Sequence, residues 1–514
     1  MGTVDPPHLE AVIEIGATGI RLLVAEISSD SKWKVVDRAE RSLALGRDVF
    51  TVGKITRESL FQCLAILLMY REALEGWSID DQHVSVVATS AFREARNRDS
   101  VLDRIAVKTG FKVRVIDGIE ENRLMFLIVH HALHDAAPKI AKANSIVIDV
   151  GGGSTEIMML QKGKVVSVHS FRMGTVIIEQ QARAIQGSDK DLRRFLAEYI
   201  RTTGENLNNE LRLNLVKQLV AIGIEAKLAA RSIGTQVTDQ FSLIARKDFV
   251  AFTDRVSALT TEEIVRQFRI SYSDAESLVP GLLAYQLLLE MTSAETVVVP
   301  FLSIREGVII SRLGGNDQLV HDEFYTQVVA SAVNLGKRYL LDEAHSWYVT
   351  RVALQFFDVL QSELGLDRHA RLLLETAGIL HDVGSFIRAV DHHIHSQYII
   401  AHSDIFGLSK DDINIVANVV RYHRSELPGP NHQSYISLPR TDRTIVLKLS
   451  ALLRVADALD RGHSQHIRDF DIELTQDSLF LRARGTHDVT LERLALDEKG
   501  DLFEELFGYK IILV

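Results

Sequence analysis

Three consecutive glycines, Gly151–Gly153, interrupt an apolar stretch that otherwise reads as β structure, VIDVGGGSTEIMML at 147–160. Glycine weakens a strand because it loses the most backbone entropy on folding and packs no side chain. The apolar runs on either side therefore predict two adjacent strands joined by a tight turn. We expect the glycines to serve a group that must approach the bare backbone closely.

A phosphate group is the first candidate for that close approach. Backbone N–H groups in a glycine turn donate to phosphate oxygens, and the hydroxyls of Ser154 and Thr155 add donors. Asp149, at the end of the first strand, can hold a divalent cation that neutralises the phosphates. The alternative is a plain hairpin whose glycines adopt positive φ. A Walker loop is excluded, because no Gly-Lys-Ser/Thr follows and the next segment is a strand.

The same pattern of strands and helices occurs twice in the first 310 residues. Each half opens with an acid-apolar-glycine turn, EIGATG at 14–19 and DVGGGST at 149–155. A duplication with pseudo-twofold symmetry would place a ligand cleft between the two turns. In the first half we expect strands within 10–50 and at 83–89 and 111–117, with helices over 56–75, 91–108 and 120–134.

The length of 514 residues predicts several domains, because single cores stop growing at roughly 250–300 residues. GGNDQLV at 314–320 reads as a linker, and the following segment to about residue 460 has helical periodicity, with Gly384 expected at a helix C-terminus. The tail from 466 reads as strands, one helix and a last strand. The predicted domains are 1–137, 138–315, 316–462 and 463–514.

Composition and charge disfavour several classes of protein. Hydrophobic residues make up 46% and charged residues 25%, which is typical of a globular chain. Apolar runs such as CLAILLMY are shorter than the ~20 residues of a membrane span. The net charge of −10 disfavours a broad surface for nucleic acid or membranes. A single cysteine, Cys63, and the absence of a signal-peptide pattern favour a cytoplasmic protein.

The order of several motifs resembles one protein family. It matches that of long exopolyphosphatase/guanosine pentaphosphate phosphohydrolase (Ppx/GppA) proteins over essentially the whole chain. The resemblance implies an α/β fold with two actin-like (ribonuclease H-like) domains, an all-α HD-like domain and a small α+β C-terminal domain. The motifs are EIGATG at 14–19, ATSAFREARN at 88–97, GIEENRL at 118–124, DVGGGSTE at 149–156, SIREGVI at 303–309 and LHDVG at 380–384.

The resemblance also implies a reaction, the removal of terminal phosphate from inorganic polyphosphate or guanosine pentaphosphate with Mg2+. Glu121 corresponds to the catalytic glutamate that activates or orients water. The alternative for this acid is a plain charge at a helix N-terminus. Asp149, Glu14 and Glu156 are expected to place the cation. The expected phosphate-binding residues are Arg93, whose guanidinium can fork two oxygens, with Thr18, Thr89, Gly151, Gly152, Gly153, Ser154 and Thr155.

The first hairpin departs from the family pattern, which usually reads Asp-apolar-Gly-Ser-Asn-Ser. Here Glu14 carries its carboxylate about one bond length further out, and Ala17 and Gly19 lack hydroxyl donors. We expect the turn to bind phosphate still, with altered metal geometry and affinity. AIGIEAKLAAR at 221–231 also lacks the Gly/Ser/Thr-rich turn of relatives, which disfavours a kinase.

The helical segment carries a second set of candidate ligands. His345, His381, Asp382 and Asp457 have the order of the HD phosphohydrolase signature, and His395 and His423 can supply further imidazoles. Histidine and carboxylate together suit a transition metal or magnesium. A structural cluster of hydrogen-bonded core histidines is the alternative.

Three rival functions stay open beside the cleft hydrolase. One is an HD-centre nucleotide phosphohydrolase, and another is a catalytically weak regulator that binds guanosine tetra- or pentaphosphate or polyphosphate. The third is a kinase, which the altered turn at 221–231 disfavours. The sequence does not distinguish polyphosphate from guanosine pentaphosphate as substrate. By analogy with two-domain relatives, a homodimer is expected.

Overall fold

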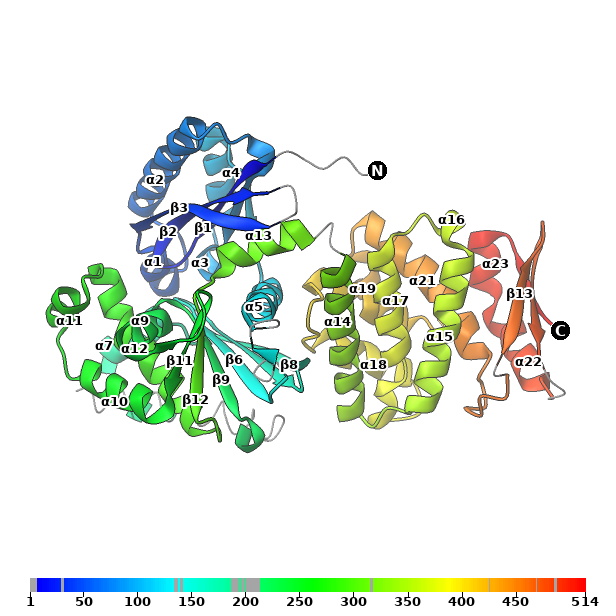
Figure 1. Ribbon diagram of the computed structural model, residues 1–514. Helices are drawn as coiled ribbons and strands as arrows, with labels where there is room; N and C mark the ends of the chain where they lie inside the picture. The colour runs from blue at the N-terminus through cyan, green and yellow to red at the C-terminus, as the bar shows by residue number, and fades with distance from the viewer. Residues whose placement is uncertain are drawn as a thin grey trace. The chain divides into compact units, whose positions relative to one another are not determined.

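The computed structural model describes residues 7–28, 32–133, 137–138, 142–185, 194–195, 198, 213–314, 318–424, 426–467, 469–484 and 488–514. It divides into two compact units, Met1–His321 and Asp322–Val514 (Figure 1). Each unit is treated by itself below. The finer predicted division into four domains stays a prediction.

The first lobe of the first unit is built on a five-stranded mixed sheet of order β3-β2-β1-β4-β5. The first three strands form an antiparallel meander, and β4 and β5 run parallel to β1. The strands are β1 His8–Ile15, β2 Gly19–Ile27, β3 Trp33–Ser42, β4 Val84–Ala88 and β5 Val113–Val115. The helices are α1 Leu45–Val52, α2 Arg57–Gly76, α3 Ser90–Glu94, α4 Arg98–Thr109 and α5 Gly118–Leu133.

The second lobe repeats this order. In its seven-stranded sheet, β10-β11-β12-β9-β6-β7-β8, the run from β8 to β12 matches the run from β3 to β5, as in the actin-like fold, and confirms the predicted duplication. The strands are β6 Ser145–Val150, β7 Thr155–Gln161, β8 Lys164–Phe171, β9 Gln218–Ile222, β10 Thr235–Gln236, β11 Phe241–Ala245 and β12 Thr296–Pro300. The helices are α7 Thr175–Ile185, α9 Ile224–Ile233, α10 Arg246–Ser257, α11 Thr261–Phe268 and α12 Tyr272–Glu290. After β12 follows α13 Ile304–Gly314, which packs on the first lobe.

Alternation along β1 explains how the first lobe is layered. Ala11, Ile13 and Ile15 are fully buried in one core with residues of α2 and α4, as expected for side chains that point to one face of a sheet. The opposite face meets α13, which lies beneath the sheet in Figure 1 and contacts β1, β2 and α5. The predicted second domain, 138–315, includes α13. In the structure the chain returns after β12 to the first lobe, where α13 packs.

Two local expectations are wrong. The helix expected over 91–108 is two helices, α3 and α4, with Asn97 between them. The linker expected at 314–320 stays a prediction: α13 ends at Gly314 and α14 begins at Gln318, Gly315–Asp317 lie outside the described residues, and the two units divide close by, between His321 and Asp322. Gly384 follows α17 within a short 3-10 turn, Val383–Phe386, and does not cap a helix.

The second unit is a helical bundle followed by a small mixed sheet of order β13-β14-β15. The helix expected in the tail is two helices separated at Gly500. The bundle comprises α14 Gln318–Arg338, α15 Glu343–Val359, α16 Gln361–Leu364, α17 Arg368–Leu380, α18 His392–Ala401, α19 Lys410–Arg421, α20 Gln433–Ile436 and α21 Arg440–Ala458. The tail comprises β13 Phe470–Leu474, β14 Ser478–Ala483, α22 Thr490–Lys499, α23 Asp501–Phe507 and β15 Lys510–Leu513. Across the residues described, no helix combines the length and apolarity that crossing a membrane requires.

Candidate functional site

The two acid-apolar-glycine turns have the same backbone geometry. In the first turn the N–H of Gly16 donates to the carbonyl of Gly19 at 2.9 Å, and in the second Gly151 donates to Ser154 at 2.9 Å. The turns also meet, because a Cβ on Gly152 would lie 2.7 Å from Cβ of Ala17. The duplication therefore places one glycine turn directly against the other.

Close approach by protein atoms explains why the second turn consists of glycines. A Cβ on Gly153 would lie 2.3 Å from the ring of Phe50 and 2.7 Å from Oγ of Ser90, both in the first lobe. None of Gly151–Gly153 has a positive φ, so the alternative of a hairpin that needs left-handed glycines is wrong. The turn is bare because two lobes pack across it.

Gly174 packs directly against the backbone of the second glycine turn, so replacing it should lower the stability of the fold. A Cβ there would lie 2.2 Å from the carbonyl carbon of Gly152 and 2.3 Å from the nitrogen of Gly153, and backbone atoms cannot move aside cheaply. We expect Gly174→Ala to destabilise the first unit by about 3 kcal/mol, the upper part of the usual range for overpacking. Chemical denaturation followed by circular dichroism measures the effect.

Gly76→Ala is the matched control, because a Cβ at Gly76 meets nothing within 4 Å. Its free energy of unfolding should stay within about 0.5 kcal/mol of the parent. Equal stability of the two variants would show that the close packing around Gly174 is not a constraint on the fold.

A cavity of about 130 Å3 lies between the two turns. Of the residues predicted from sequence, nine line it: Glu14, Thr18, Thr89, Glu121, Asp149, Gly151, Gly152, Ser154 and Glu156. Gly153 faces Phe50 instead, and the buried hydroxyl of Thr155 donates to the carbonyl of Met173. Neither residue is among those lining the cavity.

Arg93 is the third predicted residue that is not among those lining the cavity, and it connects the two lobes through contacts with two residues that do line it. Its Nη1 donates to the Glu121 carboxylate at 2.9 Å and to the carbonyl of Ile116 at 3.0 Å, and its Nη2 donates to Oγ of Ser154 at 3.3 Å. Glu121 comes from the first turn of α5 and is 5% exposed. Burial raises the pKa of Glu121, and the guanidinium of Arg93 opposes that rise.

Asp149 and Glu156 contribute two more acids, in different environments. Burial, together with Glu121 and other nearby carboxylates, raises the pKa of Asp149 to about 8. Its side chain has no hydrogen-bond or ion-pair partner in the described part of the chain. Burial and Glu121 also raise the pKa of Glu156, but that carboxylate accepts from Ser170 at 2.8 Å and from Asn122 at 3.3 Å. Asp149 is therefore the acid left to a ligand.

Glu14 lies between two guanidinium groups, which sequence reasoning did not anticipate. Its carboxylate is 3.3 Å from Nε of Arg305 on α13 and 4.0 Å from Nη1 of Arg21 on β2. Arg21 also donates to the hydroxyl of Thr18 at 3.3 Å and to Glu40 at 2.6 Å. The longer acid of this hairpin thus reaches cations that the protein supplies.

Five charged residues of the cavity wall were not predicted: Arg21, Glu225, Lys227, Asp274 and Arg305. Two of them have a signal in the sequence, since Arg21 interrupts an apolar strand and Lys227 interrupts an alanine-rich helix. Burial lowers the pKa of Lys227 to about 8 and raises that of Glu225 to about 7. These pKa shifts depend on how deeply the side chains are buried, and a sequence motif does not show burial.

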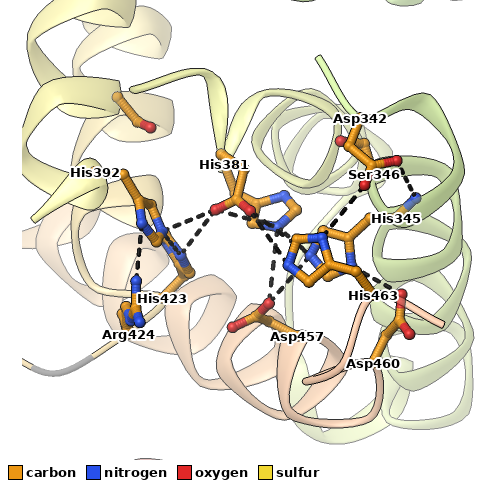
Figure 2. Close-up of polar contacts among 12 residues, drawn as sticks. Asp342, His345, Ser346, His381, His392, His423, Arg424, Asp457, Asp460 and His463 are labelled. Atoms are coloured by element: carbon orange, nitrogen blue, oxygen red, sulfur yellow. Dashed lines mark hydrogen bonds and ion pairs between the residues drawn. The ribbon is translucent and has the colours of Figure 1, made fainter. Parts of the chain in front are cut away.

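A second polar cluster lies within the bundle of the second unit (Figure 2). The structure brings together all four predicted residues, His345, His381, Asp382 and Asp457. Nε2 of His345 is 3.1 Å from Nε2 of His381 and 3.4 Å from Oδ1 of Asp457. His345 and His381 are fully buried. Because these are metal-ligand atoms within one small space, the cluster is a candidate metal centre.

The cluster is larger than the sequence indicated. His423, named from sequence, belongs to it, and His392 joins at the start of α18 in place of the expected His395. His463 also belongs, stacked on His345 with ring centroids 3.6 Å apart. The sequence shows several histidines in α18, which indicated that this segment could supply ligands. It does not show which of these histidines faces the cluster.

Comparison with known proteins identifies the family. The family profile described as "Ppx/GppA phosphatase family" matches residues 23–315, and that described as "Ppx/GppA phosphatase, domain III" matches residues 329–499. The chain belongs to the Ppx/GppA phosphatase family. The predicted resemblance is therefore confirmed, and the match to domain III agrees with the long form.

Individual relatives agree with this assignment. The guanosine-5'-triphosphate,3'-diphosphate pyrophosphatase of Photobacterium profundum is 22% identical, over 92% of this chain and 91% of its own length. The protein of the same name from Pseudoalteromonas translucida is 23% identical over the whole of both chains. The crystal structure of an exopolyphosphatase from Cytophaga hutchinsonii is 23% identical with a TM-score of 0.54, over 60% of this chain and 98% of its own. This structural similarity establishes the Ppx/GppA fold for that part of the chain.

Proposed function

We propose that this Ppx/GppA phosphatase is a phosphoric anhydride hydrolase whose site is the cavity between the two glycine turns. The hydrolysed bond would be the terminal anhydride of guanosine pentaphosphate or inorganic polyphosphate, since relatives carry names for both activities. The contact of Arg93 with Glu121 and Ser154 carries the proposal. One cation thereby joins a buried acid to a turn of bare N–H groups, which is the set of groups that phosphoryl transfer to water needs.

Each group has a defined part in this reaction. The N–H groups of the glycine turn other than that of Gly151, which donates to the carbonyl of Ser154, would position the terminal phosphoryl group together with the hydroxyl of Ser154. Arg93 would stabilise charge on its oxygens. Water attacks phosphorus in line with the bridging oxygen, whose bond to phosphorus breaks. Glu121 would orient this water and accept its proton. Because burial raises the pKa of Glu121, it is a stronger base than an exposed glutamate.

The cavity suits the magnesium ion that the family implies. Asp149 is an acid without a partner among the described residues, surrounded by the carboxylates of Glu14, Glu121 and Glu225. A cation near Asp149 would relieve this repulsion, and when bound it neutralises phosphate oxygens. Glu156 is satisfied by Ser170 and Asn122, and Glu14 lies beside Arg21 and Arg305, so we assign the ion to Asp149 rather than to all three acids.

A phosphate-release assay tests the proposed activity directly. Purified protein is offered guanosine pentaphosphate and, separately, polyphosphate of several chain lengths, with and without Mg2+. We expect orthophosphate release that depends on Mg2+, and the ratio of the two kcat/KM values identifies the preferred substrate. No release from either substrate by folded protein in the presence of Mg2+ contradicts the proposal.

Asp149→Asn gives a prediction for the cation. The amide keeps the shape of the side chain but removes the charge, so we expect at least about tenfold more Mg2+ to reach half-maximal activity, equivalent to about 1.4 kcal/mol. The increase in melting temperature that Mg2+ gives the parent should shrink as well, because ligand binding to the folded state stabilises it.

Glu276→Gln is the control for that change, because Glu276 lines a neighbouring pocket and pairs with Arg47 at 2.9 Å. Its Mg2+ dependence should equal that of the parent. If Asp149→Asn and Glu276→Gln behave alike in both measurements, Asp149 does not hold the ion.

A weakly catalytic regulator is the second candidate function, and the altered first hairpin favours it. Thr18 already accepts a hydrogen bond from Arg21, and Glu14 lies beside Arg21 and Arg305, so this hairpin offers fewer free groups to a phosphate. Calorimetric binding of guanosine pentaphosphate without measurable turnover would support this function over the hydrolase. We also propose an HD-like fold for the bundle of the second unit. A homodimer is a further proposal, which analytical ultracentrifugation tests.

A further inference from the structure

We propose that a transition-metal ion binds to His8, Glu10 and His83 in the first lobe, at a site separate from the cavity between the glycine turns. The proposal does not depend on the proposed reaction. The three side chains come from the start of β1 and from the residue that precedes β4. One ligand atom of each lies within 4.8 Å of the other two, so small rotations of the rings let a single ion contact all three.

The register of the sheet explains why these residues meet. β1 and β4 run parallel, with Ala11 opposite Val84. The residues one step earlier, Glu10 and His83, are therefore neighbours where the two strands begin. His8 precedes Glu10 by two residues, and alternate residues of a strand point to the same face of a sheet. The two residues of β1 thus present their side chains together, beside His83.

The Glu10 carboxylate contacts both imidazoles. Its Oε1 is 3.0 Å from Nδ1 of His83 and 3.5 Å from Nε2 of His8. The two rings are tilted against each other, with centroids 4.6 Å apart. Ligands at about 2.1 Å from zinc lie about 3.4 Å apart in a tetrahedron and about 3.0 Å apart in an octahedron. The separations from Oε1 are therefore those of ligands around one ion.

Burial makes this carboxylate a good partner for a cation. Glu10 is 6% exposed, and its Oε2 accepts no hydrogen bond in the described part of the chain. A buried carboxylate without its full set of hydrogen bonds is costly in free energy, and a cation bound to it offsets that cost. The side chains of His8 and His83 are 32% and 28% exposed, so an ion can reach their nitrogens from solvent.

Arg312 of α13 holds the carboxylate in this position. Its Nε lies 3.1 Å from Oε2 of Glu10, as an ion pair rather than a hydrogen bond. Its terminal nitrogens donate to the carbonyl of Gln82 at 2.7 Å and to the hydroxyl of Ser85 at 2.9 Å. These contacts keep Oε2 beside the guanidinium and leave Oε1 to the histidines. Carboxylates that bind metal are commonly oriented by a partner behind them in this way.

The same guanidinium opposes a bound cation by its charge. This repulsion is weakened because the side chain of Arg312 is 34% exposed, and charges near the surface interact through a high effective dielectric constant. The ion also gains bonds to two imidazole nitrogens, which the guanidinium cannot provide. We therefore expect a site that added Zn2+ fills and a chelator empties.

One hydrogen bond must change when the ion binds. Nε2 of His83 lies 3.3 Å from the side-chain amide of Gln82, whose oxygen and nitrogen can exchange places by rotation. With Nδ1 bound to the ion, the proton of the neutral ring is on Nε2, and the amide oxygen can accept it. Gln82 can therefore serve either state of the ring without a change in the backbone.

The donor set selects the class of metal. Two imidazole nitrogens and one carboxylate favour zinc, iron or cobalt over magnesium and calcium, which prefer oxygen ligands. Two histidines and one glutamate leave the fourth position of a tetrahedral zinc ion to water. The cluster of the second unit also offers imidazoles, so the experiment must report on the first lobe specifically.

Protection of the two imidazoles from chemical modification tests the proposal in the intact chain. Diethyl pyrocarbonate modifies accessible histidine nitrogens, and peptide mass spectrometry gives the rate at each residue. We expect Zn2+ at about ten times its dissociation constant, with excess Mg2+ present, to slow modification of His8 and His83 about tenfold. The rate at His131, an exposed residue of α5 that belongs to none of the groups with metal-ligand spacing, should not change.

Glu10→Gln tests the carboxylate ligand. The amide keeps the shape of the side chain but removes its charge, so at least about tenfold more Zn2+ should be needed for the same protection of both histidines. Glu26→Gln is the matched control, because Glu26 is an exposed acid on β2 outside the site, and its protection should equal that of the parent. Circular dichroism confirms that both variants are folded.

Two results overturn the proposal. The first is an unchanged rate of modification of His8 and His83 when the parent chain is saturated with Zn2+, a readout that needs no variant. The second is equal protection by Zn2+ in folded Glu10→Gln and in the parent, which would show that the carboxylate does not bind the ion.

Discussion

Glu121→Gln should lower kcat for phosphate release by at least about 100-fold, the usual scale for a positioned acid–base group. The amide still accepts the hydrogen bond that Arg93 donates at 2.9 Å, but it cannot take a proton from water. Folding and KM should change little, because the shape of the side chain and the contacts around the cavity are preserved. Steady-state kinetics with the preferred substrate, together with thermal unfolding, measure these effects.

Glu120→Gln is the matched control, one residue earlier in the same turn of α5. Glu120 is held by Arg123 at 2.6 Å and by Arg114 at 3.1 Å and does not line the cavity. We expect its kcat to stay within about threefold of the parent, the size of a minor change in the barrier. Turnover close to that of the parent in Glu121→Gln would exclude Glu121 as the base.

Arg93→Lys should lower kcat/KM by about 100-fold, a loss comparable with removal of one donor to transition-state charge. The change keeps the positive charge but removes the planar fork that contacts Glu121, Ser154 and the carbonyl of Ile116 together. A lysine ammonium reaches fewer of these acceptors at once, so the acid and the glycine turn would no longer be held by one group. The loss should fall on kcat more than on KM if this cation acts mainly in the transition state.

Arg98→Lys is the matched control, because it makes the same arginine-to-lysine substitution at a nearby position. Arg98 begins α4, is exposed and contacts Asp99 at 3.2 Å, so its replacement should leave both kinetic parameters unchanged. If Arg93→Lys retains the activity of the Arg98→Lys protein, the contact on which the proposed function rests has no catalytic role.

The positions of the two acid-apolar-glycine turns could be predicted from the sequence because they depend on local chemistry. A strand pair interrupted by Gly151–Gly153 leaves few conformations other than a tight turn, and the repeat of the acid-apolar-glycine pattern at 14–19 indicated a duplicated lobe. The structure agrees with this duplication, since the meander and the parallel strands recur in both lobes, but the strand order itself comes from the structure. Local chemistry alone did not place Glu121, Arg93 and Asp149 together. The prediction that they belong to one site also required the family resemblance.

Local periodicity failed where a distant contact determines the backbone. The side chain of Asn97 accepts from the N–H of Ile55 at 3.0 Å and donates to its carbonyl at 2.9 Å, next to the break between α3 and α4. Nothing in the spacing of apolar residues over 91–108 reports a hydrogen bond to a segment forty residues away. Thr155 is a similar case, because its hydroxyl is used by Met173 rather than by a ligand.

The histidine cluster shows the same division between sequence and tertiary structure. Residue type and order already indicated His345, His381, Asp382 and Asp457, since few other side chains offer metal ligands. The choice of His392 over His395 depends on where α18 begins, and that start follows Asp391, which has a φ of 58°. A sequence states which groups are available for chemistry, but only the packed chain brings their atoms within bonding distance and removes them from water.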